Sequence, residues 1–173
     1  MENQDVLRAL VALRNSGIAV GFSTSGVGQS ETIFKALEIA FDGELLFSSV
    51  QSTWNVLEQS ADSALQAAHE AGLKVIVKEA VANGRLTSRN PNLPRFSGLA
   101  EQYNTTMDGL ALSAVINRPW ISVVLSGAAN AAHLRSNLKA QEIVWSEELE
   151  QSIKSFCETP ENYWTTRSSL AWN

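Results

Sequence analysis

Four short apolar runs alternate along the chain with longer stretches in which apolar residues recur at a helical period. The runs occupy residues 18–24 (IAVGFST), 45–51 (LLFSSVQ), 73–80 (LKVIVKEA) and 121–127 (ISVVLSG). Near-continuous apolar runs separated by helical patterns are typical of parallel strands covered by helices. The pattern therefore predicts an α/β fold with four parallel strands and flanking helices.

Helical periods fill the segments around these runs. One helix is expected to start at an N-cap Ser30 and to end at Asp42-Gly43. The other expected helices cover residues 2–15, 59–71, 99–117 and 131–140, and one more follows residue 146.

Two segments stand outside this alternation. Residues 83–94 (NGRLTSRNPNLP) are rich in turn formers and predict a long surface loop, a kind of segment that is often functional. The last part of the chain predicts an aromatic tail that packs against the body of the protein rather than binding a ligand. Its aromatic residues are Tyr163, Trp164 and Trp172.

Composition narrows the class of protein. The chain has 173 residues, which suits one domain, and 13 Lys plus Arg against 18 Asp plus Glu. The net charge of -5 argues against nucleic acid or an anionic membrane as the main partner. No segment resembles a membrane span or an export signal, and Cys157 is the only cysteine, so we expect a cytoplasmic protein without an internal disulfide.

Polar and small residues gather where the predicted strands end. Ligands bind at the carboxyl ends of the strands in open parallel sheets and in (β/α)8 barrels alike. The candidates for a binding site are Ser23, Thr24, Gln51, Lys78, Glu79 and the residues from Gly127 onward.

The first strand end looks like a phosphate-binding loop but lacks its chemistry. Residues 21–30 (GFSTSGVGQS) connect a strand to a helix and are rich in glycine. However, Ser23 stands where the first Gly of such a loop belongs, and Gln29 stands where a Lys would neutralise the phosphates. We therefore interpret the segment as an ordinary βα turn.

Gln51 and the segment after the fourth strand each allow two interpretations. A Gln51 amide at a strand end suits the carboxamide of a cofactor, but it can equally bridge neighbouring strand ends. The small residues of 127–130 (GAAN) let an anion approach the backbone at a helix start, with His133 and Arg135 nearby, although a plain turn before a solvated helix fits the same pattern.

Taken in order, four segments resemble one family. They are GFSTSG (21–26), VQSTWNVLEQS (50–60), KVIVKEAVANGRLT (74–87) and VVLSGAANAAHLRSNL (123–138). These segments are similar to the fifth to eighth βα units of the aldo-keto reductases, NADPH-dependent enzymes built on a (β/α)8 barrel. The resemblance covers essentially the whole chain. It implies a single domain, residues 1–173, that forms the carboxyl-terminal half of a TIM-type barrel.

The resemblance also implies cofactor contacts. Ser23, Thr24 and Gln51 would surround the nicotinamide carboxamide. Lys78 stands where many members stack an aromatic residue on the nicotinamide. The Gly127, Ala128 and Ala129 segment would hold the adenosine phosphate, His133 takes the place of an Arg that binds the 2'-phosphate in many members, and Asn137 would contact adenine. The implied cofactor is NADP(H), with NAD(H) as the alternative.

The catalytic residues of the family lie elsewhere. Its Asp, Tyr, Lys and His tetrad comes from the first four strands, which precede the units matched here. Tyr103, Tyr163 and His69 occupy a helix, the tail and another helix, so none is assigned as a proton donor. We therefore expect no catalytic residue and no metal site in this chain, and no reductase activity from the chain alone.

Two hypotheses for the function follow. In the first, the chain is the cofactor-facing half of a carbonyl reductase. In the second, it is a non-enzymatic half-barrel that serves as a binding or assembly module. Four parallel strands leave two unpaired edges and an apolar inner face, so either hypothesis predicts pairing with a second copy or with an amino-terminal half.

Overall fold

The structure, a computed structural model, describes residues 3–170 and contains a four-stranded parallel sheet. The strands lie in the order β1-β4-β5-β6, and each neighbouring pair runs parallel. This confirms the predicted α/β fold. The strands, each shorter than the apolar run that predicts it, are β1 (Gly21–Ser23), β4 (Ser49–Thr53), β5 (Lys74–Lys78) and β6 (Val123–Val124).

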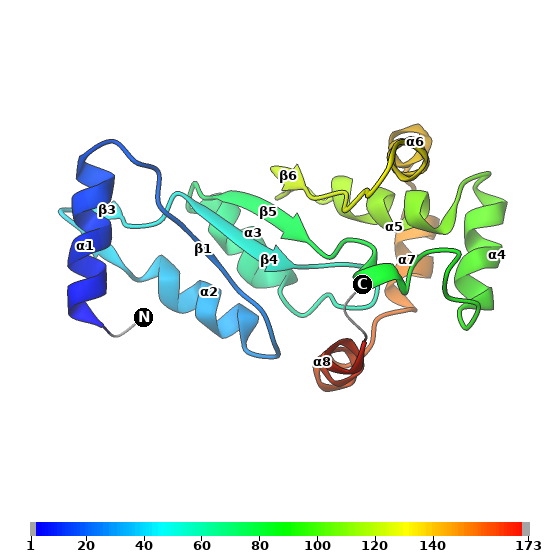
Figure 1. Cartoon of the computed structure of the whole chain (residues 1–173), viewed down its shortest axis with the longest axis horizontal. Helices are drawn as coiled ribbons and strands as arrows, with labels where there is room; N and C mark the ends of the chain where they lie inside the picture. Colours follow the sequence, from blue (N-terminus) through cyan, green and yellow to red (C-terminus); the bar gives the residue numbers. More distant parts are fainter. Residues whose placement is uncertain (1–2, 171–173) are drawn as a thin grey trace.

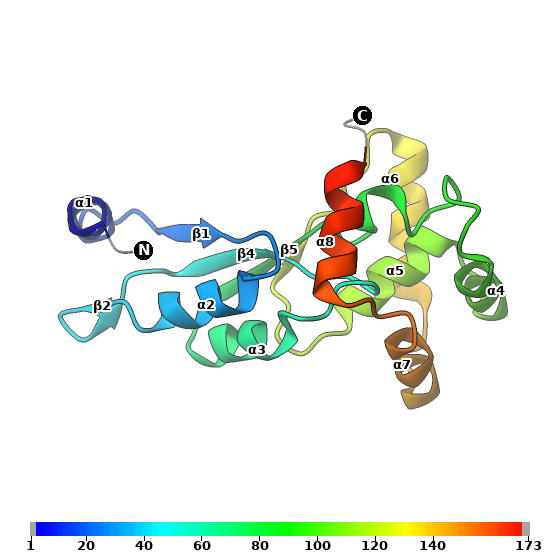
Figure 2. The same ribbon diagram turned by 90° about the horizontal axis from the view of Figure 1, so that it is seen from below.

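Helices surround this sheet unevenly. α2 and α3 lie against one face, whereas no helix of residues 3–170 covers the opposite face of β1 and β4 (Figure 2). α1 lies beside a small hairpin at one end of the elongated molecule, and α4 to α8 gather at the other end (Figure 1). The helices are α1 (Gln4–Asn15), α2 (Gln29–Leu37), α3 (Asp62–Glu70), α4 (Pro94–Gln102), α5 (Met107–Ile116), α6 (Ala131–Leu138), α7 (Glu147–Lys154) and α8 (Pro160–Ser169), with the short 3-10 helices η1 (Ala82–Gly84) and η2 (Lys139–Glu142).

The two faces of the sheet differ because side chains alternate along each strand. We call the face that packs against α2 and α3 the covered face, and its members are fully buried: Val50, Ser52, Val75 and Val77. We call the other face the open face. Five of its members are exposed or half-buried, namely Ser23, Gln51, Ile76, Lys78 and Val123, whereas Thr53, in register with Lys78, is buried.

The approach of β1 to β4 depends on a glycine. Gly21 pairs with Ser49, and a Cβ atom at residue 21 would lie 2.2 Å from Ser49 Oγ. A side chain at residue 21 would require Ser49 to move, because the Ser49 carbonyl oxygen also lies only 3.0 Å from that position. The absence of a side chain at Gly21 is therefore what lets β1 join the sheet and brings Ser23 beside Gln51.

The predicted helix that starts at Ser30 has different ends. It begins at Gln29 with Gly28 as the N-cap, while the Ser30 hydroxyl donates to the Ser60 carbonyl at 2.7 Å. It ends at Leu37, and Asp42-Gly43 forms the turn of the hairpin β2 (Ala40–Phe41) and β3 (Glu44–Leu45). Both turn residues have positive φ, 55° and 82°, as a two-residue hairpin turn requires.

The helix predicted over 99–117 is wrong, because two helices replace it. Asn104, with φ of 51°, turns the chain after α4, and the Thr106 hydroxyl accepts from the Gly109 N–H to start α5. Pro94, predicted to lie in the preceding loop, is the first residue of α4, a position where its missing N–H is not needed.

The aromatic tail contains a helix that the prediction lacked. Thr159 caps α8 and Pro160 begins it. Tyr163 is completely buried, and the Trp164 ring packs against it with ring centroids 5.4 Å apart. The predicted packing of the tail against the body is therefore confirmed for these two residues, while Trp172 lies outside the described residues.

Residues 3–170 hold no helix of the length and apolar character needed to span a membrane.

Candidate functional site at the carboxyl ends of the strands

Ser23 and Gln51 lie side by side on the open face. Ser23 pairs in register with Gln51, which pairs in turn with Ile76 on β5. The Gln51 amide is half-buried, and within residues 3–170 it makes no hydrogen bond, so it does not bridge strand ends in this structure. A free amide beside a hydroxyl offers both donors and acceptors to a ligand that carries an amide of its own.

Thr24 faces the opposite way. It is buried on the covered side, where its hydroxyl donates to Ser52 Oγ at 3.0 Å. The structure therefore separates it from Ser23 and Gln51, the two residues with which the sequence groups it. A Thr24 contact to a ligand on the open face would need a change of rotamer and the loss of this bond.

Thr24 belongs to a buried network that ties β1 and β4 to α2. The Ser52 hydroxyl donates to Gln29 Oε1 at 2.9 Å, and Gln29 Nε2 donates to the Thr53 carbonyl at 3.0 Å. Gln29 Nε2 also lies 3.4 Å from Glu58 Oε1. Gln29 is thus a structural residue that holds α2 against β4. The segment 21–30 forms the βα turn that we predicted from the absence of a phosphate-binding lysine at residue 29.

Lys78 ends β5 and reaches across the open face to β1. Its ammonium donates to Ser25 Oγ at 2.9 Å and to Ser23 Oγ at 3.2 Å. Burial is the main cause of a lowered pKa for Lys78, the charge of Arg167 adds to the lowering, and the Glu79 carboxylate opposes it. The ammonium therefore lies directly beside one of the two residues that the open face offers to a ligand.

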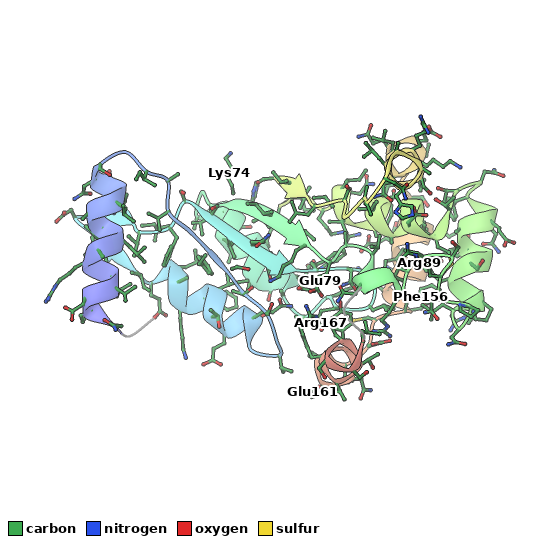
Figure 3. The ribbon with its side chains drawn as sticks, in the orientation of Figure 1. Lys74, Glu79, Arg89, Phe156, Glu161 and Arg167 are labelled. Atoms are coloured by element: carbon green, nitrogen blue, oxygen red, sulfur yellow. The ribbon has the colours of Figure 1, made fainter. Side chains whose placement is uncertain are left out.

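Glu79 turns away from Lys78. Its φ of 57° directs the carboxylate to α8, where Arg167 Nη2 lies 2.7 Å from Glu79 Oε1 (Figure 3). The hydrogen bond that Arg167 donates to Glu79 is the main cause of the raised pKa of Arg167. Lys78 and Glu79, both candidates for the site, therefore contact different neighbours: Lys78 contacts Ser23, and Glu79 forms an ion pair with Arg167.

Tyr163 completes the contact between α8 and the strand ends. Its hydroxyl accepts from Asn55 Nδ2 at 2.9 Å and donates to Glu79 Oε2 at 3.4 Å. Burial is the main cause of a strongly raised pKa for Tyr163. The side chain is a structural link, because its hydroxyl is enclosed and does not reach the open face.

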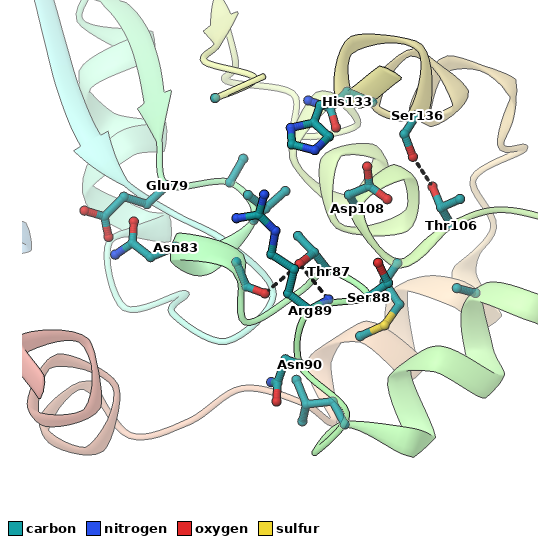
Figure 4. Close-up of a pocket in the computed structure, with 18 of the residues that line it drawn as sticks. Glu79, Asn83, Thr87, Ser88, Arg89, Asn90, Thr106, Asp108, His133 and Ser136 are labelled. Atoms are coloured by element: carbon teal, nitrogen blue, oxygen red, sulfur yellow. Dashed lines mark hydrogen bonds between the residues drawn. The ribbon is translucent and has the colours of Figure 1, made fainter. Parts of the chain in front are cut away.

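A cleft of about 1170 Å³ lies next to Lys78. Its walls come from the loop after β5, the start of α5, the segment between β6 and α6, and the end of α8 (Figure 4). Ligand pockets typically measure about 300 to 1,000 Å³, so this cleft has room for an extended ligand. The candidate Glu79 lines it, as do six of the predicted cofactor contacts: Lys78, Gly127, Ala128, Ala129, His133 and Asn137.

The segment between β6 and α6 forms a turn that is fixed by hydrogen bonds of the side chains of Asn130 and Asn137. Gly127 has φ of 63°, and the Asn130 side chain caps α6 by accepting from the His133 N–H at 2.9 Å. The Asn137 amide donates to the Ser126 carbonyl at 3.0 Å, which fixes the loop to its helix. Residues 127–129, whose side chains are small, line the cleft, and the Ala128 N–H donates to Ser126 Oγ at 3.4 Å.

The sequence reasoning missed a cation in this cleft. Arg89 comes from the loop predicted over 83–94, and its side chain points into the cleft between Glu79 and His133 (Figure 4). Asp108, in the first turn of α5, lies on the same wall as His133. The length of the loop indicated function, but no pattern singled out Arg89. Within residues 3–170, no cluster of three His, Cys, Asp or Glu side chains is placed to hold a metal ion.

Comparison with known proteins gives a family match. The model of the family described as Aldo/keto reductase family matches residues 2–158. A search of curated proteins finds no match.

Several solved structures have a similar fold. An aldo-keto reductase from Bacillus halodurans, in its holo form, matches with 19% sequence identity and a TM-score of 0.68, over 88% of this chain and 55% of that one. A putative 2,5-diketo-D-gluconic acid reductase B matches with 20% identity and a TM-score of 0.69, over 88% and 50%. A thermostable aldo-keto reductase in complex with the inhibitor epalrestat matches with 20% identity and a TM-score of 0.66, over 89% and 56%. The chain thus spans about half the length of these structures.

Proposed function

The chain belongs to the aldo/keto reductase family, and we propose that it carries the cofactor-binding part of a nicotinamide-dependent site that reduces carbonyls to alcohols. The observation that supports this most is the position of Lys78. Its side chain lines the cleft and also contacts Ser23 on the open face, so the two regions form one continuous surface. A dinucleotide needs such a surface, because its two ends require different contacts.

The residues along this surface fit the parts of NADP(H). Ser23 and Gln51 suit the carboxamide of the nicotinamide, since that group needs both a donor and an acceptor. The backbone of 127–129 and the Arg89 guanidinium suit the phosphates. His133 and Asn137, which line the same cleft, would lie at the adenosine end. The cofactor is therefore NADP(H) in our proposal, and NAD(H) is the alternative because His133 stands where many members of the family carry an Arg for the 2'-phosphate.

In our proposal the cofactor supplies the chemistry, and the residues of this chain bind and orient it. When bound, the reduced cofactor supplies a hydride to the carbonyl carbon. The described residues bind the carboxamide and the phosphates and thereby orient the ring on the open face. Neither Tyr103 nor Tyr163 is among the residues that line the cleft, and the Tyr163 hydroxyl is bonded to Asn55 and Glu79. The 173-residue chain by itself is thus expected to bind the cofactor without turnover of an aldehyde.

Titration of the purified chain with NADPH tests this proposal. The five Trp residues serve as fluorescence donors, and saturable binding is expected. Ala129→Asp should weaken it by roughly tenfold, because a carboxylate would stand where a phosphate is expected to bind. Ala132→Asp is the matched control: Ala132 is also exposed but does not line the cleft, so affinity should hardly change. Absence of saturable binding by the folded chain would overturn the proposal.

An aldehyde assay tests the second part of the proposal. NADPH oxidation with a generic aromatic aldehyde should not exceed the rate without protein. Robust turnover by the pure 173-residue chain would show that it holds a proton donor of its own.

The open face supports the assembly proposal, with one change to its chemistry. The predicted apolar inner face corresponds to the open face, which is more polar than predicted. The residues in register near the amino ends of β1, β4 and β5 are Gly21, Ser49 and Lys74. Ile76 and Val123 provide apolar surface near the centre of this face. The outer edges of β1 and β6 have no neighbouring strand within residues 3–170. We propose that this face and these edges pair with a second copy or an amino-terminal half. Light scattering coupled to size exclusion tests self-pairing, and a stable monomer at high concentration would exclude it.

A further inference from the structure

Lys78 places a positive charge at one particular part of the proposed cofactor site. Its ammonium lies 3.2 Å from Ser23 Oγ, and Ser23 is in register with Gln51. These are the two residues that suit the nicotinamide carboxamide. The charge is therefore next to the ring and not next to the phosphates, which lie toward the Gly127 loop in the proposed function.

No carboxylate of the described residues is in contact with this ammonium. Within residues 3–170, no carboxylate oxygen lies within 4.0 Å of Lys78 Nζ. Glu79, the next residue, is held by Arg167 at 2.7 Å and by the Tyr163 hydroxyl. The groups that hold the ammonium are the neutral hydroxyls of Ser23 and Ser25. The charges of Glu79 and Arg167, which pair with each other, act on Lys78 with opposite signs, so these three side chains together carry one positive charge near Ser23.

We propose that Lys78 makes the site discriminate between the two oxidation states of the cofactor in favour of the reduced one. This inference rests on the proposed function. The nicotinamide ring carries one positive charge when oxidised and none when reduced, whereas the phosphates are the same in both forms. A cation within several ångströms repels the oxidised ring, and at the effective dielectric of a partly exposed site the effect is on the order of tenfold in affinity. The reduced cofactor is loaded preferentially, and release of the oxidised cofactor is favoured.

A purely structural role for Lys78 is the competing explanation. The two hydrogen bonds tie the end of β5 to the end of β1 across β4, and losing them can reduce stability. Such a role predicts that both cofactor forms lose affinity by the same factor. Discrimination predicts instead that the two dissociation constants change by different factors. The ratio of the two constants therefore separates the explanations.

The test measures the dissociation constants of NADPH and NADP+ by calorimetry for the full 173-residue chain and three variants. Lys78→Met removes the charge, and Lys78→Arg keeps it. Lys74→Met is the matched control, since Lys74 is on the same face of the same strand but at its amino end (Figure 3). The ratio of the NADP+ constant to the NADPH constant should fall by roughly tenfold in Lys78→Met only.

A second measurement does not depend on the folding of any variant. Raising the ionic strength weakens binding of both forms, because both carry the same phosphates. For the unmodified chain it should also lower the ratio of the NADP+ dissociation constant to the NADPH dissociation constant, because salt screens the repulsion of the oxidised ring. An equal ratio in Lys78→Met and the unmodified chain, or a ratio insensitive to salt, overturns the inference while leaving the proposed function intact. Failure of both forms to bind the folded chain overturns the proposed function itself.

Discussion

The covered and open faces of the sheet are built from the same strands but carry different kinds of side chain. On β5, Val75 and Val77 are completely buried against helices, while Ile76 and Lys78 between and beside them remain partly exposed. On β4, Ser52 is bonded into a closed polar network, while the neighbouring Gln51 amide makes no bond within residues 3–170. Because side chains alternate along each strand, the residues of the covered face contribute to the stability of the fold, and polar groups on the open face remain available to bind a ligand.

The largest effect should come from deleting core volume on the covered side. Leu65 of α3 is completely buried, and Leu65→Ala should lower the free energy of unfolding by about 2 to 5 kcal/mol. Gln51→Ala on the open face should change it by less than about 0.5 kcal/mol while weakening NADPH binding. Urea denaturation of both variants measures the difference. Equal losses of stability would mean that the two faces are not specialised in this way.

Breaking the buried network should have an intermediate effect. Gln29→Ala removes the partner of Ser52 Oγ and of the Thr53 carbonyl, and a buried group left unsatisfied costs about 1 to 3 kcal/mol. Ser25→Ala is the control, because it removes one acceptor from Lys78 at an exposed position. The same denaturation experiment checks both variants. A Gln29→Ala protein as stable as Ser25→Ala would contradict the structural role of the network.

Tyr163 should produce a smaller effect that depends on pH. Its pKa is raised above the ordinary value of 10.0 by burial, so above pH 10 the folded chain keeps a proton that the unfolded chain loses. Unfolding then releases a proton, and stability falls as pH rises by roughly 1 kcal/mol per pH unit. Tyr163→Phe should remove this part of the dependence. The comparison is made by denaturation between pH 9 and 11, and identical slopes for the two proteins would contradict the prediction.

The smallest effect concerns a single exposed cation in the cleft. Arg89→Gln should weaken NADPH binding by roughly threefold to tenfold at low salt, and by less at high salt, because an exposed charge is strongly screened. Arg8→Gln on α1 removes the same charge far from the cleft and should leave the affinity unchanged. Fluorescence titration measures both variants, and equal affinities would remove Arg89 from the proposed site.

The sheet could be predicted from the sequence because its signal is local. Each buried strand is a short apolar run, and the helical stretches between the runs force the strands to be parallel. The register, and with it the pairing of Ser23 with Gln51, could not be predicted, since it depends on the close approach at Gly21. Asp42-Gly43 is a strong hairpin pattern, so the prediction that it ends a helix is wrong, and the dipeptide instead joins β2 to β3.

The candidate site was harder to predict than the sheet. Positions at strand ends follow from the fold, which is why six of the predicted residues line one cleft. The direction of a side chain depends on contacts from distant elements, and Thr24 turns toward Ser52 for that reason. Arg89 enters the cleft because its loop folds back over the strand ends, and no spacing within residues 83–94 encodes that path.

The most direct test of the central claim is amide hydrogen exchange of the 173-residue chain with and without saturating NADPH. If the open face and the cleft bind the cofactor, added protection should appear in peptides covering residues 83–94 and 125–133, and exchange in α3 should not change. Protection confined to α3 and the covered side, or no protection at a concentration that saturates fluorescence, would contradict the account.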